Sequence, residues 1–284
     1  MTFNYIDIHS HLNFPDFDKD REDEIEKIQN EKIATIVVGT DYESSSACLE
    51  LAEKYQNIFA CIGQHPGNLD RDSVFDERLE QLADNKNVVA IGECGLDYFR
   101  LTPEPSEGNE DRAIATNDLK MIQKTVFEYH IDLALTLDLP LMLHIRSSKG
   151  TQDAYNDALD ILEHHAKING EKLRGNAHFF AGDMGVLRRL LSIGFTVSFT
   201  GVVTFARDYD EVIKAVPLEM IMAETDAPFV APIPHRGKRS SPLHIPEVVK
   251  KIAEIRDESE TVVKKAIIDN TLRMFPAIGE SIAQ

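Results

Sequence analysis

The chain has 284 residues, of which 43% are apolar, and it carries a net charge of −18. This length and apolar content predict a folded protein with a sizeable core, and the acidity excludes a broad basic surface for nucleic acid. No apolar run approaches the ~18 residues that span a membrane, and the first residues lack the basic start and apolar run of a signal peptide. We expect a cytoplasmic protein with three reduced cysteines, Cys48, Cys61 and Cys94.

Short runs of β-branched and apolar residues alternate with helical patterns along the chain, which is typical of βα units and a parallel sheet. The predicted strands span residues 5–12, 33–41, 58–66, 87–97, 140–147, 175–182, 195–201 and 220–228. Apolar spacings near 3.6 predict a helix through Leu119, Ile122, Val126, Leu133 and Leu137. Eight such units predict one (β/α)8 TIM barrel over residues 1–284, with a doubly wound sheet as the alternative.

Residues 101–118 interrupt this alternation. The segment is rich in proline, glutamate and glycine and is longer than a usual βα loop. We interpret it as an insertion over one end of the sheet, either a functional lid or an extra loop that the fold tolerates.

Chemically active side chains recur where the predicted strands end. His9 and His11 are two residues apart, so both project to the same side of an extended backbone. The other residues at or near strand ends are His65, Glu93, Asp97, His144, Arg146, His178, Glu224 and Asp226. In a (β/α)8 barrel the site is built at the C-terminal ends of the strands. Because buried imidazoles and charges need partners, metal ligation explains these residues together.

Four histidines and two carboxylates are too many for one tetrahedral ion with an open position, and they suit two divalent ions that share a carboxylate. The expected ligands are His9 and His11 for the first ion, His144 and His178 for the second, and Glu93 as the bridge. Asp226 can reach the first ion and a bound water, so it is the candidate general base. This ligand set suits Mg²⁺, Mn²⁺ or Zn²⁺.

These motifs resemble those of the TatD family of metal-dependent deoxyribonucleases, within the amidohydrolase-like barrels. The segments that carry the resemblance are "IDIHSHLNF", "IGQHPGN", "AIGECGLDYFR", "LPLMLHIRS", "AHFFAG" and "ETDAPFVAPIPHRGKR", which span almost the whole chain in the family's order. "GECGLDY" and "ETDAPFVAP" are the specific ones. The resemblance implies a two-metal hydrolase of DNA phosphodiester bonds, often an exonuclease acting from the 3′ end. It supports the same six metal ligands, with Glu93 and Asp226 as the catalytic residues.

By analogy with the family, several further residues are expected to orient the substrate: His65, Tyr98, Arg100, Arg146 and Arg236. Several of them have structural alternatives, because His65 can cap its strand end, Tyr98 can simply pack and Arg236 can be an ordinary surface residue. The chain departs from the family pattern at Phe179–Ala181, His130 and Ser240, which leaves the ligand set intact and bears on substrate choice. The expected partner is nucleic acid, with DNA favoured, and we expect no membrane contact and a monomer or weak oligomer.

Two other functions remain open at this level. The same metal site could attack a carbonyl group, as in an aminoacyl-tRNA deacylase, an amidase or a lactonase, because this barrel hosts many activities. A metal-holding scaffold protein without activity is the second alternative. Its signature would be a missing ligand or base, and neither is missing here.

Overall fold

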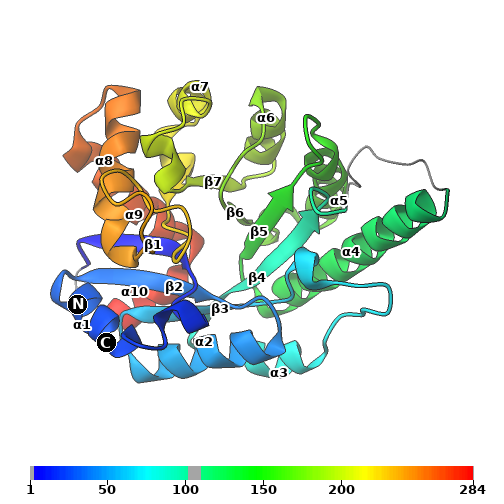
Figure 1. The fold of residues 1–284 in the computed structure, drawn as a ribbon, viewed down its shortest axis with the longest axis horizontal. Coiled ribbons are helices and arrows are strands. Elements are labelled where there is room, and N and C mark those ends of the chain that lie inside the picture. The colour runs from blue at the N-terminus through cyan, green and yellow to red at the C-terminus, as the bar shows by residue number, and fades with distance from the viewer. Residues whose placement is uncertain (1–2, 102–109, 284) are drawn as a thin grey trace.

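The computed structural model describes residues 3–101 and 110–283, and its eight parallel strands form one sheet that closes nearly into a barrel (Figure 1). The strands are β1 (Tyr5–Ser10), β2 (Ile33–Val38), β3 (Ile58–Ile62), β4 (Val88–Asp97), β5 (Leu141–Arg146), β6 (Gly175–Ala177), β7 (Thr196–Phe199) and β8 (Ile221–Ala223). Their order in the sheet follows the chain from β1 to β8. This confirms the predicted (β/α)8 barrel over the doubly wound alternative.

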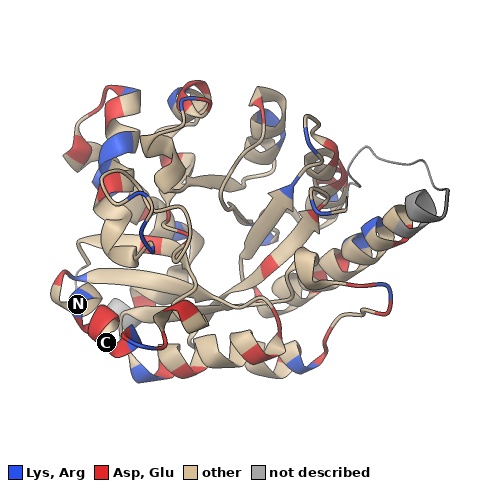
Figure 2. Cartoon of the chain, in the orientation of Figure 1, with Lys and Arg blue, Asp and Glu red and all other residues tan. Residues whose placement is uncertain are grey.

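Helices surround the strands, and charged residues of both signs are spread along them (Figures 1 and 2). They are α1 (Arg21–Asn30), α2 (Tyr42–Lys54), α3 (Arg78–Ala83), α4 (Glu110–Leu137), α5 (Asp153–Asn169), α6 (Met184–Ser192), α7 (Asp210–Ala215), α8 (Ile245–Arg256), α9 (Glu260–Met274) and α10 (Pro276–Ala283). Short 3₁₀ turns are η1 (Pro15–Phe17), η2 (Pro66–Asn68), η3 (Gly170–Lys172), η4 (Gly201–Thr204), η5 (Leu218–Met220) and η6 (Pro242–His244). Within the described residues, no helix has the length and apolarity needed to cross a bilayer.

Helix α4 begins earlier than the sequence analysis predicts. Residues 110–118, which we expected to belong to the insertion, form its first turns, so that part of the prediction is wrong. The segment "EDRAIATND" contains neither proline nor glycine and starts with two acidic residues, which favours a helix N-terminus. Residues 102–109 lie outside the described part of the chain, so a lid over the site stays a prediction.

Apolar side chains fill the end of the barrel where the strands begin. Ile6 and Ile8 of β1 belong to this inner cluster, together with side chains from β2, β3, β4, β5 and β8. Phe275 and Ile278, near the end of the chain, pack against the same cluster. A separate, larger cluster lies between the strands and the surrounding helices. The polar residues are therefore left to the other end of the barrel.

An irregularity in the pairing of β1 determines the direction in which its histidines point. Three residue steps from Asp7 to Ser10 match only two steps along β2, so the regular alternation of sides breaks there. Ile8 packs inside the barrel, and His9, the next residue, faces the barrel mouth as well. β4 has the same mismatch where it carries Glu93. Both strands thus bend locally where they carry predicted metal ligands.

The barrel closes through a short seam between β1 and the residues after β8. A single bridge joins Ser10 to Ala227. The backbone N–H of His11 donates to the carbonyl of Ala227 at 2.6 Å, and that of Asp226 donates to the carbonyl of His9 at 2.9 Å. The first pair of predicted ligands and the candidate base therefore lie on opposite sides of this seam.

Candidate metal centre

The six predicted metal ligands lie together at the C-terminal ends of the strands. They are His9, His11, Glu93, His144, His178 and Asp226, of which all but the partly exposed His144 are buried. Groups of three of these residues present ligand atoms that all lie within 4.8 Å of one another, such as His9, His11 and Glu93. The sequence analysis therefore selected residues that the fold does assemble; their binding of metal stays a prediction.

Four ligand atoms surround one point on the β1 side of the centre. Nε2 of His9 and Nε2 of His11 are 3.3 Å apart. Oε2 of Glu93 lies 3.6 Å from Nε2 of His9 and 3.8 Å from Nε2 of His11, and Oδ1 of Asp226 lies 3.9 and 3.5 Å from the same two atoms. A tetrahedral ion with bonds of about 2.0–2.1 Å places its ligand atoms about 3.3–3.4 Å apart. The four atoms therefore fit one divalent ion after small movements.

The other oxygen of Glu93 faces a second group of imidazoles. Oε1 lies 2.8 Å from Nδ1 of His144, 3.1 Å from Nε2 of His178 and 3.5 Å from Nε2 of His65. A carboxylate that bridges two ions must present its oxygens in this way, one to each ligand group.

The ring nitrogens that face away from the centre meet oxygen acceptors in three of the four histidines. The contacts are His11 Nδ1 to Val38 O at 2.9 Å, His144 Nε2 to Asp97 Oδ2 at 3.1 Å and His178 Nδ1 to Glu224 Oε2 at 3.3 Å. Because carbonyl and carboxylate oxygens accept hydrogen bonds, each outer nitrogen carries a proton, and in the neutral ring the inner nitrogen has the lone pair that a metal requires. Lone pairs and carboxylate oxygens thus converge on the centre, a set that a cation satisfies.

The pKa values at the centre follow from this crowding. Burial alone would lower the pKa of His178, but the carboxylates of Glu224 and Glu93 outweigh it and raise that pKa well above its usual value. Burial, followed by the neighbouring His178, lowers the pKa of His9 to about 4. Protons on imidazoles and a metal ion thus compete for the same carboxylates, so metal binding should release protons.

Asp7 fixes the backbone around the first ligand group. It is fully buried and accepts hydrogen bonds from the backbone N–H of Thr225 at 2.9 Å, the hydroxyl of Thr225 at 2.6 Å and the N–H of His9 at 3.2 Å. Asp226 follows with a left-handed backbone, φ 52°, which turns its carboxylate toward His11. The sequence analysis missed Asp7; the available signal was an acidic residue inside the buried run "YIDIHS".

His65 caps a turn with one ring nitrogen and turns the other toward the centre. Its Nδ1 caps η2 by accepting the N–H of Gly67 at 2.9 Å. Burial, with a smaller effect from His144, lowers the pKa of His65 to about 3. The neutral ring therefore carries its proton on Nε2, 3.5 Å from Oε1 of Glu93, and offers a hydrogen-bond donor to the centre.

Tyr98 is not brought to the centre. It is fully buried, its hydroxyl donates to Asp157 at 2.8 Å, and the amino group of Lys120 lies 4.0 Å from its ring centroid. These contacts tie Tyr98 to α4 and α5. The geometry favours the packing alternative, because a phenol committed to a carboxylate on the outer helices has no path to the substrate.

The three arginines predicted to contact substrate lie at a strand end or on a segment that follows one: Arg146 ends β5, whereas Arg100 follows β4 and Arg236 follows β8. Arg100 lies beside the η2 turn, next to Gly67. The guanidinium of Arg146 stacks on Phe99 at 3.9 Å from its ring centroid, and that of Arg236 stacks on Phe205 at 3.7 Å. Among the described residues, none of these three arginines forms an ion pair, whereas Arg239 of the same "HRGKR" run pairs with Asp20 at 2.7 Å. Within the described part of the chain, no carboxylate therefore neutralises the charge of these three arginines.

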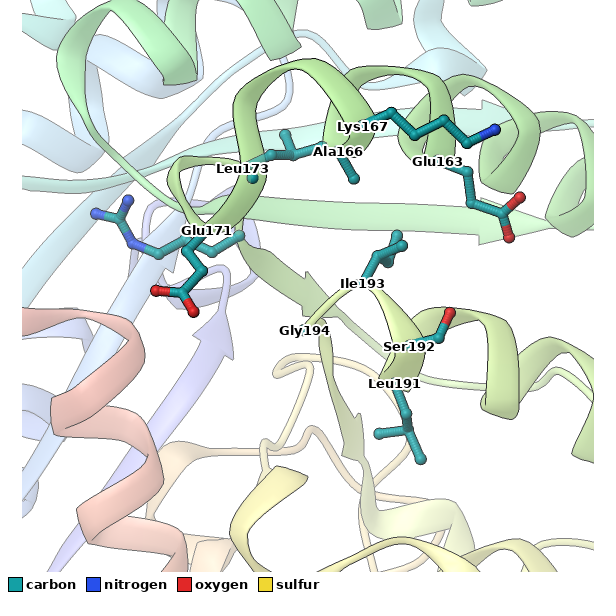
Figure 3. A pocket seen from close by; sticks show the side chains of 11 residues that line it. Glu163, Ala166, Lys167, Glu171, Leu173, Leu191, Ser192, Ile193 and Gly194 are labelled. Atoms are coloured by element: carbon teal, nitrogen blue, oxygen red, sulfur yellow. The ribbon is translucent and has the colours of Figure 1, made fainter.

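A cavity of about 910 Å³ lies at the opposite end of the barrel, between the end of α5, η3 and the end of α6 (Figure 3). Its lining is apolar at Leu173, Leu191 and Ile193, with Glu163 and Lys167 among the charged groups around it. None of the described groups of potential metal ligands includes a lining residue. The described groups of potential metal ligands therefore lie away from this cavity.

The sequence profile of the TatD related DNase family matches residues 6–276. An uncharacterized metal-dependent hydrolase of Bacillus subtilis, YabD, is 35% identical over 276 residues, covering 95% of this chain and 98% of that protein. YcfH of Escherichia coli K12, named likewise, is 31% identical over 277 residues, covering 95% of each. The crystal structure of YjjV, a TatD homolog from Escherichia coli K12, matches with a TM-score of 0.79 and 26% identity, covering 97% of this chain and 99% of that one. The chain therefore belongs to the TatD family of metal-dependent hydrolases.

Proposed function

We propose that this hydrolase is a deoxyribonuclease that uses two divalent metal ions and removes nucleotides from the 3′ end of DNA. The observation that carries the proposal is the carboxylate of Glu93, whose two oxygens face separate groups of ligand atoms. The description of the matching family as TatD related DNases supports the choice of substrate.

The residues fit two ions in distinct surroundings. His9, His11 and Asp226 would hold one ion, His144 and His178 the other, with Glu93 shared between them. Bound divalent ions supply a nucleophile at neutral pH, by lowering the pKa of water, and offset the charge of the phosphate. Accepting the proton of the attacking water and binding the phosphates are proposed to be done by side chains.

Asp226 is the proposed general base. Its carboxylate faces the centre, 3.5 Å from Nε2 of His11, and no backbone N–H of the described residues donates to it. Its backbone is fixed by the N–H donated to His9 and by the neighbouring Thr225, which Asp7 holds. A carboxylate that is positioned but not consumed by hydrogen bonds can accept a proton from attacking water.

His65 and the unpaired arginines are proposed to bind the phosphates. The N–H of His65 points toward Glu93 and is within reach of a phosphate oxygen bound at the centre. Arg146 and Arg236 stack on phenylalanines and pair with no carboxylate that the structure describes, and the favourable ring contact holds the guanidinium without neutralising it. Local positive charge of this kind lets a protein of net charge −18 bind an anionic substrate.

The test is a metal-reconstituted assay with end-labelled single- and double-stranded DNA and RNA. We expect metal-dependent shortening of DNA from the 3′ end, abolished by chelation and by Asp226→Asn. A parallel series of esters, lactones and misacylated tRNA covers carbonyl hydrolysis. Cleavage of that series with intact DNA would overturn the proposal in favour of the carbonyl hydrolase.

A further inference from the structure

Helix α4 carries two buried polar side chains that face the strand ends, Gln123 and His130. They are seven residues apart, about two helical turns, so they share one face of the helix. Gln123 is 2% exposed and His130 is fully buried, while Phe127 and Ile131 beside them pack in the apolar core. Burying an amide or imidazole group costs free energy unless the group forms hydrogen bonds. The hydrogen-bond partners of Gln123 and His130 therefore indicate what the two residues do.

Gln123 binds backbone groups from two different loops. Its Oε1 accepts the N–H of Asp97 at 2.9 Å, and its Nε2 donates to the carbonyl of Asp97 at 3.2 Å and to the carbonyl of Pro66 at 3.1 Å. One side chain therefore joins the end of β4 to the η2 turn that follows β3. Both amide protons and the amide oxygen are used, which leaves no freedom to rotate the group without losing a bond.

His130 holds the residue before His65. Its Nδ1 donates to the carbonyl of Val126 at 2.8 Å, which leaves the lone pair of Nε2 to accept the backbone N–H of Gln64 at 3.0 Å. The ring of Phe75 packs perpendicular to it, with centroids 5.0 Å apart. The position of the Gln64 backbone is thereby set by α4.

The two segments that α4 holds are the end of β4 and the chain around the η2 turn. They carry groups that face the second ligand group, around Oε1 of Glu93. His65 lies 3.5 Å from Glu93, and Asp97 lies 3.1 Å from Nε2 of His144. We propose that Gln123 and His130 are positioning residues for the reaction, His130 by aiming the N–H of His65 at the substrate phosphate and Gln123 by orienting His144 through Asp97. This proposal rests on the proposed function for the part that His65 plays.

Gln123 should affect metal affinity and His130 should affect phosphate binding, so the two roles can be tested separately. Gln123→Leu leaves the N–H and carbonyl of Asp97 unpaired, so we expect affinity for the second metal ion to fall ~10–100-fold, as for other residues that orient metal ligands. His130→Leu should leave the affinity for both ions unchanged and weaken phosphate binding, seen as a raised KM for DNA. His130→Gln keeps an acceptor within reach of Gln64 and should restore the KM. Thr125→Ala, at an exposed position of the same helix, is the control for general damage to α4.

Double-mutant cycles give the decisive measurement, because residues that act through one another are not additive. In a His65→Ala background, His130→Leu should have no further effect on kcat/KM, and in an Asp97→Ala background Gln123→Leu should have none on metal affinity. Calorimetric titration of the metal-free protein with Zn²⁺ or Mn²⁺ measures its affinity for the metal ions. Titration of the metal-loaded protein with inorganic phosphate measures the phosphate affinity that is expected to depend on His65. Neither titration needs DNA, so failure of the DNase proposal leaves this test intact. Additive cycles, or variants that only lower the melting temperature, would overturn it.

Discussion

The carboxylate of Asp97 lies 3.1 Å from Nε2 of His144 and accepts a hydrogen bond from its N–H. In the neutral ring this leaves the lone pair on Nδ1, which lies 2.8 Å from Oε1 of Glu93 on the side of the centre. The carboxylate thus selects the ring nitrogen that can bind a metal, and this selection can be tested without any substrate.

Asp97→Asn should reverse the selection. An asparagine amide can donate to Nε2, which favours the tautomer with its proton on Nδ1, facing the centre. We expect affinity for the second ion to fall ~10–100-fold while the first ion still binds. Calorimetric titration with Zn²⁺ measures both affinities, and two ions bound as tightly as in the wild type would contradict the assignment.

Removal of Glu93 should cost more than removal of one histidine of the first pair. Glu93→Ala takes one ligand from each ion, whereas His11→Ala takes one ligand from a single ion. We expect Glu93→Ala to lose both ions on dialysis and His11→Ala to keep one. Metal content by mass spectrometry and turnover of the same samples decide the matter; near wild-type activity with two ions bound to Glu93→Ala refutes the bridge.

Asp226→Asn separates the roles of base and ligand. The amide oxygen can still face the first ion, so part of the metal affinity should remain. Loss of a positioned base typically lowers the rate ~10²–10⁴-fold. The pH–rate profile should lose its acidic limb, which reports ionisation of the base. An unchanged profile in the variant would place the base elsewhere.

The salt dependence of DNA binding should distinguish arginines within one short run. Arg236 stacks on Phe205 without an ion pair among the described residues, whereas Arg239 pairs with Asp20. The slope of log K against log salt is about −0.9 per phosphate on duplex DNA and about −0.7 on single strands. In an Asp226→Asn background we expect a slope worth about two or three phosphates. Arg236→Ala should reduce it by one phosphate and Arg239→Ala should not. Equal effects of both would show that the run acts as a diffuse basic patch.

The stability of the metal-free protein should depend on His130 below neutral pH. Burial lowers the pKa of His130 from 6.5 to about 4. Between these values the unfolded chain binds a proton that the folded chain does not. Stability from this group is therefore present above pH 6.5 and is lost as the pH falls toward 4, by up to about 1.4 kcal/mol per pH unit. Urea unfolding at pH 7 and pH 5 should show a smaller loss for His130→Gln than for the wild type. Parallel losses would show that His130 is protonated in the folded state.

The repeating parts of the fold could be predicted from the sequence because they depend on local patterns. Each β-branched run became a strand, although the predictions ran several residues too far where polar site residues continue the extended chain, as after β3 and β8. The placement of His9 and His11 on one side depends only on spacing along an extended backbone, and their Nε2 atoms do meet.

The supporting residues could not be predicted because their partners are distant in the chain. Asp7 reads as an interruption of an apolar strand until Thr225 is seen beside it. Gln123 reads as one more polar helix residue until the backbone of Asp97 is brought to it. Tyr98 stands next to a site motif, yet its direction is set by Asp157 on α5. Sequence periodicity indicates which face of an element is buried, but not which polar group from elsewhere in the chain will contact that face.

The seam between β1 and the end of β8 has a consequence for how the protein holds its shape. His9 and His11 lie on one side of it and Asp226 on the other, so residues 12–225 of the 284-residue chain lie between the two sides. An ion bound to all three would link the first strand to the end of the last one and close a loop that contains β2 to β8 and the helices between them. Because the ligands come together only in the folded protein, such an ion would bind the folded chain in preference to the unfolded one and so stabilise the fold. The cation proposed for catalysis would then also hold the barrel closed. A cell short of metal would therefore contain a less stable protein as well as an inactive one.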